Sequence, residues 1–158
     1  PPRSENIEEL SQLLIFWSDI CRNASLEITL IFDTGSDWIT IESSTCSNCL
    51  GVNFKYDESS TFEFAAEDYS KREYGSATLS GIEAKDKVCL LDDSTHGDRF
   101  CLPLFEWFLV TKQHGINARI DGVLGLSRSV MAEVDAEDYD RGVGPLIVKQ
   151  LAEQHVLD

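Results

Sequence analysis

The chain of 158 residues has room for one domain with a full-sized core, or for one half of a two-domain protein. Its 28 acidic side chains outnumber the 13 basic ones and give a formal charge of −15, which argues against binding to nucleic acid or to anionic membranes. No long apolar run occurs, and no charged and then apolar leader opens the sequence, so we expect neither a transmembrane helix nor a visible signal peptide.

The sequence begins with a divergent N-terminal segment, residues 1–25, which is polar and acidic at first and then mixed. The apolar residues between positions 10 and 17 fit a short helix and a strand equally well. From residue 26 to residue 30 apolar and polar side chains alternate, which is the period of a strand with one solvent-exposed face.

An apolar run over residues 30–32 ends abruptly in Asp33-Thr34-Gly35-Ser36. Gly35 permits a tight reversal, which leaves Asp33 at the tip of a buried strand and at the edge of the core. A carboxylate in that position must be hydrogen-bonded or have its pKa shifted, and this is how a fold makes an acid useful in catalysis. The same residue types also form ordinary turns, so a simple loop after a strand is the alternative.

Further strands are predicted downstream. An apolar segment that begins at Ile39 predicts a strand to about residue 45, and residues 56–62 indicate a turn or a capped helical turn. Residues 74–91 alternate again, and Gly75 and Gly81 are expected to bracket the tip of a mobile β-hairpin. A plain edge hairpin is the alternative.

The last third of the sequence predicts two more strands and a helix. Residues 105–111 are strongly apolar, and residues 120–127 are apolar with glycines that suggest close backbone packing. Residues 133–140 are acidic and predict a surface loop, after which Pro145 is well placed in the first turn of a helix. Many short strands and few helices predict a mostly β fold.

Five cysteines are present. Cys46 and Cys49 have the spacing of half a zinc site or of a redox pair, but no second motif completes a metal site, so a short structural disulfide is favoured. Cys89 and Cys101 flank a polar stretch almost symmetrically, as cross-strand partners in a hairpin do, and predict a second disulfide. Cys21 is left over, either as a buried thiol or as the partner of a segment not present here.

Four motifs in this order resemble the N-terminal lobe of the pepsin-like aspartic proteases, over roughly residues 26–158. Asp33-Thr34-Gly35-Ser36 is similar to the catalytic loop of that family, and Cys46 to Cys49 with the following segment is similar to its small disulfide loop. Tyr74 to Gly81 resembles the flap hairpin, and Ile120 to Leu126 resembles the strand that crosses behind the catalytic loop. The resemblance implies a mostly β lobe of antiparallel sheets with a flap hairpin and few short helices.

The resemblance implies peptide-bond hydrolysis in acid, by two aspartates that share a proton and hold a water between them. Asp33 matches the first of these catalytic aspartates. By resemblance Thr34 braces two symmetry-related loops, Gly35 allows the loop and the substrate to approach closely, and Ser36 donates a hydrogen bond to the Asp33 carboxylate. No cofactor and no metal are needed.

The resemblance also implies a substrate-binding flap. Tyr74 would lie over the cleft, and Gly75 and Ser76 would offer backbone donors to an extended peptide or protein substrate. Trp38 follows the catalytic loop sooner than the tryptophan that partners the flap tyrosine in most members, which leaves its contact with Tyr74 open.

The chain departs from the family in one major respect, because no second Asp-Thr-Gly or Asp-Ser-Gly occurs in it. We therefore consider an endopeptidase whose other acid comes from a second lobe, a homodimer in which two copies of Asp33 meet, and a non-catalytic binding or structural module. A lone lobe should expose an apolar face where its mate belongs.

The expected compartment is oxidising. Two disulfides and the N-glycosylation acceptor Asn23-Ala24-Ser25 are consistent with a secretory route. Together with acid chemistry, they predict a glycoprotein of the secretory pathway that is extracellular or lies in an acidic, lysosome-like or vacuole-like compartment.

Overall fold

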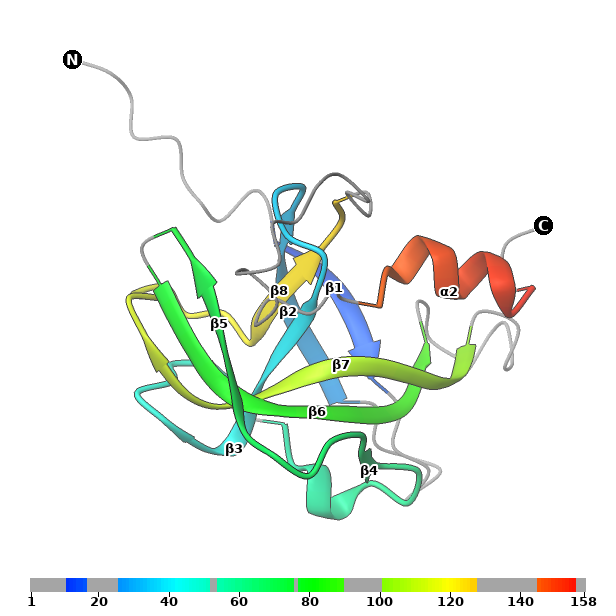
Figure 1. Cartoon of the computed structure of the whole chain (residues 1–158), viewed down its shortest axis with the longest axis horizontal. Coiled ribbons are helices and arrows are strands. Elements are labelled where there is room, and N and C mark those ends of the chain that lie inside the picture. Colours follow the sequence, from blue (N-terminus) through cyan, green and yellow to red (C-terminus); the bar gives the residue numbers. More distant parts are fainter. Residues whose placement is uncertain are drawn as a thin grey trace.

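The computed structural model describes residues 11–16, 26–51, 54–75, 77–89, 101–127 and 145–155. In this part of the chain the strands are β1 (Ser11–Phe16), β2 (Leu26–Asp33), β3 (Ile39–Ser47), β4 (Glu63–Phe64), β5 (Ser70–Tyr74), β6 (Ala77–Cys89), β7 (Cys101–His114) and β8 (Gly122–Gly125). A short 3-10 helix, η2 (Tyr56–Glu58), precedes β4, and the α-helix α2 (Ile147–Glu153) follows the strands (Figure 1).

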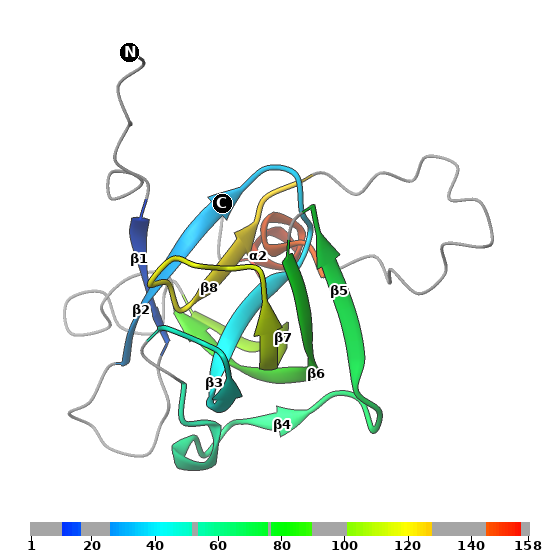
Figure 2. The same ribbon diagram turned by 90° about the vertical axis from the view of Figure 1, so that its left-hand side faces the viewer.

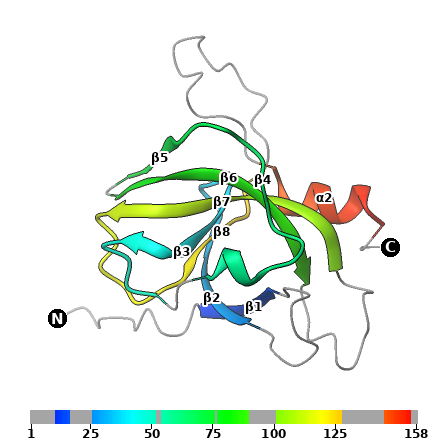
Figure 3. The same ribbon diagram turned by 90° about the horizontal axis from the view of Figure 1, so that it is seen from below.

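The strands form one sheet in the order β1-β2-β8-β3-β7-β6-β4, and β5 pairs with β6 outside this path. β1 also pairs with β6, where Phe16 lies opposite Val88, so the sheet curls until strands from its two sides meet (Figure 2). Seen from below, β6 and β7 run side by side, and α2 lies at one end of them (Figure 3). The curled sheet encloses the core.

Alternation along the strands explains which side chains fill this core. In β2 the side chains of Ile28 and Leu30 are fully buried, as the apolar and polar alternation in the sequence predicts. The largest fully buried side chains are those of Trp107, Phe105 and Phe108, and all three belong to β7. Strand β7 is therefore the main apolar wall of the core.

The prediction of a mostly β lobe is confirmed, although the sheet is mixed rather than purely antiparallel. β2 and β8 are parallel, and so are β3 and β7, whereas β8 and β3 are antiparallel. The partners of each parallel pair lie far apart in the sequence, because β8 and β7 come late and lie beside the much earlier strands β2 and β3. Local patterns in a sequence carry no signal for such pairing.

Two expectations for individual residues need correction or completion. The ambiguous segment near the N-terminus is strand β1, which pairs with β2 along its whole length. Gly81 is not at the hairpin tip, because it lies inside β6, where an added Cβ would lie 2.0 Å from the Leu109 carbonyl oxygen. Close packing of β6 against β7, rather than a turn, explains the glycine at this position.

Several expectations concern residues outside those that the structure describes. They are the acidic loop at 133–140, the leftover Cys21, the glycosylation acceptor Asn23 and the flap residue Ser76. Within the described ranges, no helix combines the length and the apolar character that crossing a membrane requires.

Candidate active site

Asp33 is the last residue of β2, and backbone groups on both sides hold it in place. Its carbonyl oxygen accepts a hydrogen bond from the Leu126 amide at 2.8 Å, directly beyond the end of β8. Its carboxylate oxygen Oδ1 accepts a hydrogen bond from the Gly35 amide at 2.9 Å. The Asp33 side chain is half-buried. The predicted position of this acid, at the tip of a strand and at the edge of the core, matches this geometry.

The end of β8 supports the turn that follows Asp33. The Gly125 amide donates to the Trp38 carbonyl oxygen at 3.0 Å, and the Ser127 amide donates to the Ser36 carbonyl oxygen at 2.9 Å. A Cβ added to Gly125 would lie 2.6 Å from the Trp38 carbonyl oxygen and 2.7 Å from the carbonyl carbon of Asp37. Only a glycine therefore allows β8 to come this close to the turn.

The side chains of the turn do not all behave as the family resemblance implies. Ser36 Oγ is buried and has no hydrogen-bond partner among the described residues, so the expected bond to the Asp33 carboxylate is not made in this structure. The Gly35 amide occupies that role instead. Thr34 is exposed.

The candidate flap is the hairpin made by β5 and β6. Its tip begins at Gly75, whose φ of +43° lies in the left-handed region that favours glycine. Tyr74 is the last residue of β5 and is half-buried. Its ring packs against a cluster of buried side chains, namely Trp38, Leu79, Phe108 and Val110. Trp38 and the flap tyrosine therefore share one apolar cluster.

The pKa of Tyr74 also reflects the charges of the Asp33 turn. Burial raises the pKa of the Tyr74 phenol above its usual range, and the charges of Asp37 and Asp33 raise it further, whereas Arg72 lowers it in part. The phenol therefore keeps its proton and can act as a hydrogen-bond donor. Asp33 lies close enough to Tyr74 for the carboxylate charge to act on the phenol.

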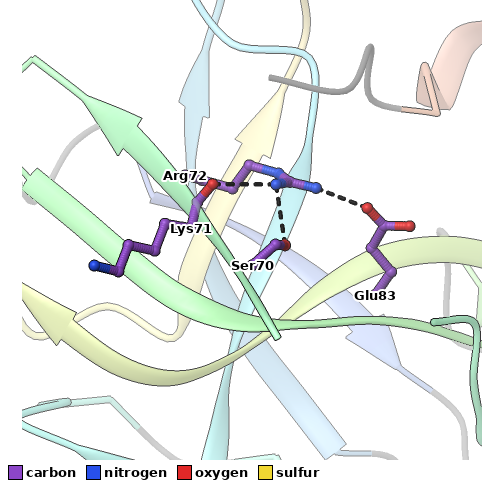
Figure 4. A network of polar contacts seen from close by, with 4 residues as sticks. All are labelled: Ser70, Lys71, Arg72 and Glu83. Carbon is purple, nitrogen blue, oxygen red and sulfur yellow. Dashed lines mark hydrogen bonds and ion pairs between the residues drawn. The ribbon is translucent and has the colours of Figure 1, made fainter. Parts of the chain in front are cut away.

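No sequence motif singles out Arg72, which lies two residues before Tyr74 in β5. Its guanidinium is buried beneath the hairpin and forms a network with Ser70, Lys71 and Glu83 (Figure 4). The signal was present in the period-2 alternation of β5, because Arg72 has the same parity as the inward-facing Tyr74.

The cysteine predictions fare differently. Cys46 and Cys49 form a disulfide, and both half-buried side chains pack against the cluster that contains Trp38. Cys89 lies opposite Cys101 in the β6–β7 ladder, and Cys101 is disulfide-bonded. The side chain of Cys89 lies outside the described residues, so this second pairing stays a prediction.

The surroundings of Asp33 include exposed apolar side chains. Phe32, which directly precedes Asp33 in the chain, is 39% exposed. Leu126, whose amide donates to the Asp33 carbonyl oxygen, is 36% exposed. Among the described residues no group of three or more histidine, cysteine, aspartate or glutamate side chains is arranged to hold a metal ion.

Comparison with known proteins agrees with these features. Residues 23–158 match the family model of the eukaryotic aspartyl proteases. The chain is 34% identical to pepsin II-1 of Oryctolagus cuniculus over 116 residues, which cover 70% of this chain and 28% of that relative. It is 29% identical to vacuolar protease A of Neurospora crassa over 139 residues, which cover 82% of this chain and 30% of that relative.

The chain thus spans less than a third of the length of either curated relative. The family match, in contrast, extends over most of the sequence and includes the Asp33 turn, the hairpin and β8. On this evidence the chain belongs to the eukaryotic aspartyl protease family, with the architecture of a single pepsin-like lobe.

Proposed function

We propose that this chain contributes one catalytic aspartate, Asp33, and a substrate-binding flap to an aspartic-type endopeptidase. The observation that carries the proposal is the Asp33 turn, in which the carboxylate is half-buried and accepts a hydrogen bond from the Gly35 amide at 2.9 Å. This bond fixes the rotation of the carboxyl group. A fixed carboxyl group can hold a water molecule in line with a peptide carbonyl.

In the proposed reaction Asp33 shares one proton with a second carboxyl group. The ionised member of the pair removes a proton from the water, which attacks the peptide carbonyl carbon, while the protonated member donates to the carbonyl oxygen. Thr34 and Ser36 belong to the same turn and would support it against the partner. Two carboxyl groups that close cannot both ionise, so the reaction should proceed in acid.

The flap would hold the substrate over Asp33. Tyr74, at the end of β5, would form one wall of a substrate cleft, and Gly75 with Ser76 would offer backbone amides to an extended peptide. Extended peptides pair with backbone groups regardless of side chain, so this contact would supply affinity rather than sequence preference.

The second carboxyl group would come from another lobe or from another copy of this chain. The exposed side chains of Phe32 and Leu126 beside Asp33 support a covered face at this position. A homodimer that brings two copies of Asp33 together is therefore the second candidate. A binding module without catalysis is the third, and it predicts no dependence of any activity on Asp33.

The printed names of the relatives, a pepsin and a vacuolar protease, support an acidic extracellular or vacuole-like compartment. The Cys46–Cys49 disulfide is consistent with a secretory route. Glycosylation at Asn23 belongs to the same proposal.

The test is hydrolysis of a peptide substrate at about pH 4, where a pair of carboxyl groups with a shared proton should work. The chain is assayed alone and after refolding with the part of the Neurospora protease that it does not match. Asp33→Asn should lower the rate of hydrolysis at least about 10³-fold in whichever assembly is active, because it removes the acid that activates the water. Activity that survives Asp33→Asn would contradict the proposal.

Activity of the chain alone would identify the homodimer, and activity only after refolding would identify the two-lobe enzyme. In the homodimer, adding an excess of the Asp33→Asn chain should suppress the wild-type activity, because mixed dimers hold only one acid. Glu73→Gln, on the outward face of β5, is the matched control and should leave hydrolysis unchanged.

A further inference from the structure

The flap strand carries a positive charge on its inner face. In β5 the outward-facing Lys71 and Glu73 are exposed, whereas Arg72 between them is only 7% exposed. Arg72 has the same parity as Tyr74, so both side chains point from the hairpin toward the body of the lobe. Buried arginine is uncommon, because removing its charge from water is costly unless other groups compensate for the loss.

Polar groups of the hairpin itself compensate for part of this cost. The Arg72 Nη2 group donates to Glu83 Oε1 on β6 at 2.7 Å, and Nη1 donates to Ser70 Oγ and to the Lys71 carbonyl oxygen, each at 3.1 Å (Figure 4). The Glu83 side chain is 29% exposed, so the ion pair is open to solvent on one side only. These bonds fix the direction of the guanidinium within the hairpin.

Two aromatic rings of the body compensate for a further part of the cost, although the buried Nε of Arg72 has no hydrogen-bond partner among the described residues. The Arg72 Cζ atom lies 4.8 Å from the ring centroid of Trp38 and 4.8 Å from that of Phe108. The two rings pack edge to face, with centroids 6.2 Å apart. A guanidinium over two aromatic faces is held by cation–π attraction as well as by packing.

These contacts connect the flap to the catalytic turn. Trp38 ends the turn that begins at Asp33, and its carbonyl oxygen accepts the hydrogen bond from Gly125. Phe108 belongs to β7 in the wall of the core. Among the described strands β5 pairs with β6 alone, so its backbone ladder does not fix the tip of the hairpin over Asp33. Arg72 provides a direct contact between the two.

We propose that Arg72 is a positioning residue, which fixes the flap and Tyr74 above the Asp33 turn by inserting its guanidinium between the flap and the rings of Trp38 and Phe108. The role of the hairpin as a flap rests on the proposed function, but its attachment through Arg72 does not. The attachment is therefore tested first in a way that needs no hydrolysis.

The test is backbone amide hydrogen exchange of the whole chain, with Arg72→Met compared with the wild type. Methionine keeps an unbranched apolar side chain and removes the charge. Exchange at Tyr74, Ala77 and Leu79, whose amides face the partner strand in the β5–β6 ladder, should accelerate about tenfold, because the cation–π contacts and the ion pair no longer oppose opening of the hairpin. Exchange in β7 should not change. Lys71→Met, which removes the neighbouring exposed charge, is the control and should leave the hairpin unchanged.

Two further variants separate positioning from general stability. Arg72→Lys keeps the positive charge for Glu83 and should restore part of the protection, and Glu83→Gln should loosen the hairpin by a smaller factor than Arg72→Met. If Arg72→Met does not fold, Glu83→Gln carries the test. Unchanged exchange in the hairpin, or equal acceleration in the hairpin and in β7, would overturn the proposal.

In an assembly that hydrolyses peptides, Arg72→Met should raise KM more than it lowers kcat, because a loosened flap binds substrate less well before the chemical step. Arg72→Lys should recover part of the loss. An equal loss in kcat and kcat/KM, without a change in KM, would contradict positioning through the flap. Failure of the Asp33 test would leave the exchange result standing, so the two proposals fail separately.

Discussion

The shape of the Asp33 turn depends on a residue of β8 that lies behind it. Gly125 brings β8 so close to the turn that a Cβ there would lie 2.6 Å from the Trp38 carbonyl oxygen. The atoms that it would meet are backbone atoms, which cannot rotate away. A methyl group at this position must therefore displace either β8 or the residues that follow Asp33.

Gly125→Ala should lower the free energy of unfolding by about 1–3 kcal/mol, which is the usual cost of inserting a methyl group into packed structure. Urea denaturation followed by tryptophan fluorescence measures this loss. Gly35→Ala is the comparison, because its Cβ would lie 3.3 Å from Asp33 Oδ1, at the end of a side chain that can shift. If both variants lose the same free energy, the close approach of β8 is not the cause.

At the scale of elements, one buried acid connects η2 and the turn after it to β6. Asp86 is fully buried in β6, and its Oδ1 atom accepts hydrogen bonds from the hydroxyl groups of Ser59 and Thr61 and from the Lys87 amide. Burial raises the pKa of the Asp86 carboxyl, and the three hydrogen bonds offset part of this shift. Burial, together with the charge of Asp121, raises the pKa of Glu42 as well, against a hydrogen bond from Gly51.

These raised pKa values predict a fold that is more stable in acid. An acid whose pKa is higher in the folded protein than in the unfolded chain binds its proton more tightly when folded. Its contribution to stability is therefore fully present below the unfolded pKa and is lost as pH rises through the folded pKa. The ordinary values are 3.8 for Asp86 and 4.5 for Glu42, so the loss should begin near these values and continue upward.

Asp86→Asn should make the free energy of unfolding less dependent on pH over this window. The asparagine oxygen can still accept hydrogen bonds at this position, and the amide does not titrate. Thermal unfolding measured from pH 3.5 to pH 7 tests this, with the exposed Asp57→Asn in η2 as the control. Parallel stability curves for Asp86→Asn and the wild type would refute the assignment.

The elements that the sequence predicted are those with a local pattern. Alternation predicted β2, and the apolar run at 105–111 predicted the middle of β7. Pro145 predicted a helix here, but α2 begins only at Ile147, so the proline lies before the helix and not in its first turn. Gly81 was misread because a glycine in a strand and a glycine in a turn look alike without knowledge of the neighbouring strand. The parallel pairing of β2 with β8 depends on contacts between distant residues and has no local signal.

The candidate site was predictable to a similar extent. Asp33 and Tyr74 occur in motifs that resemble a known family, whereas Arg72 occurs in none and a charged residue is normally expected at the surface. Its burial depends on the ring of Trp38, which directly precedes β3, and on the ring of Phe108 in β7. No local sequence pattern shows that these two rings lie together. The expected hydrogen bond from Ser36 to the Asp33 carboxylate is not made in this structure. The Gly35 backbone amide donates to that carboxylate, and a motif made of side chains does not predict a backbone contact.

At the scale of the whole molecule, the exposed apolar side chains beside Asp33 predict association. Phe32 is 39% exposed on β2, next to Asp33. We expect sedimentation velocity to show species heavier than the 17.7 kDa monomer. The fraction of these species should rise with protein concentration. Phe32→Ser should shift the distribution toward the monomer.

Phe64→Ser is the matched control, because Phe64 is 53% exposed and lies on β4, at the opposite end of the strand order. If association depends on the face around Asp33, this control should leave the distribution unchanged. Equal effects of the two substitutions would indicate general stickiness and would remove the support for a specific covered face.

The position of β8 between β2 and β3 also constrains how the protein is made. β2 and β3 are synthesised early and follow each other directly, yet the strand that separates them in the sheet leaves the ribosome only after β7. A nascent chain must therefore keep these neighbours apart, or separate them again, until residue 125 is available. Such late, long-range pairing is slow. A chain interrupted before Gly122 would contain Asp33 and the whole β5–β6 hairpin, but the strand that shapes the Asp33 turn would be missing.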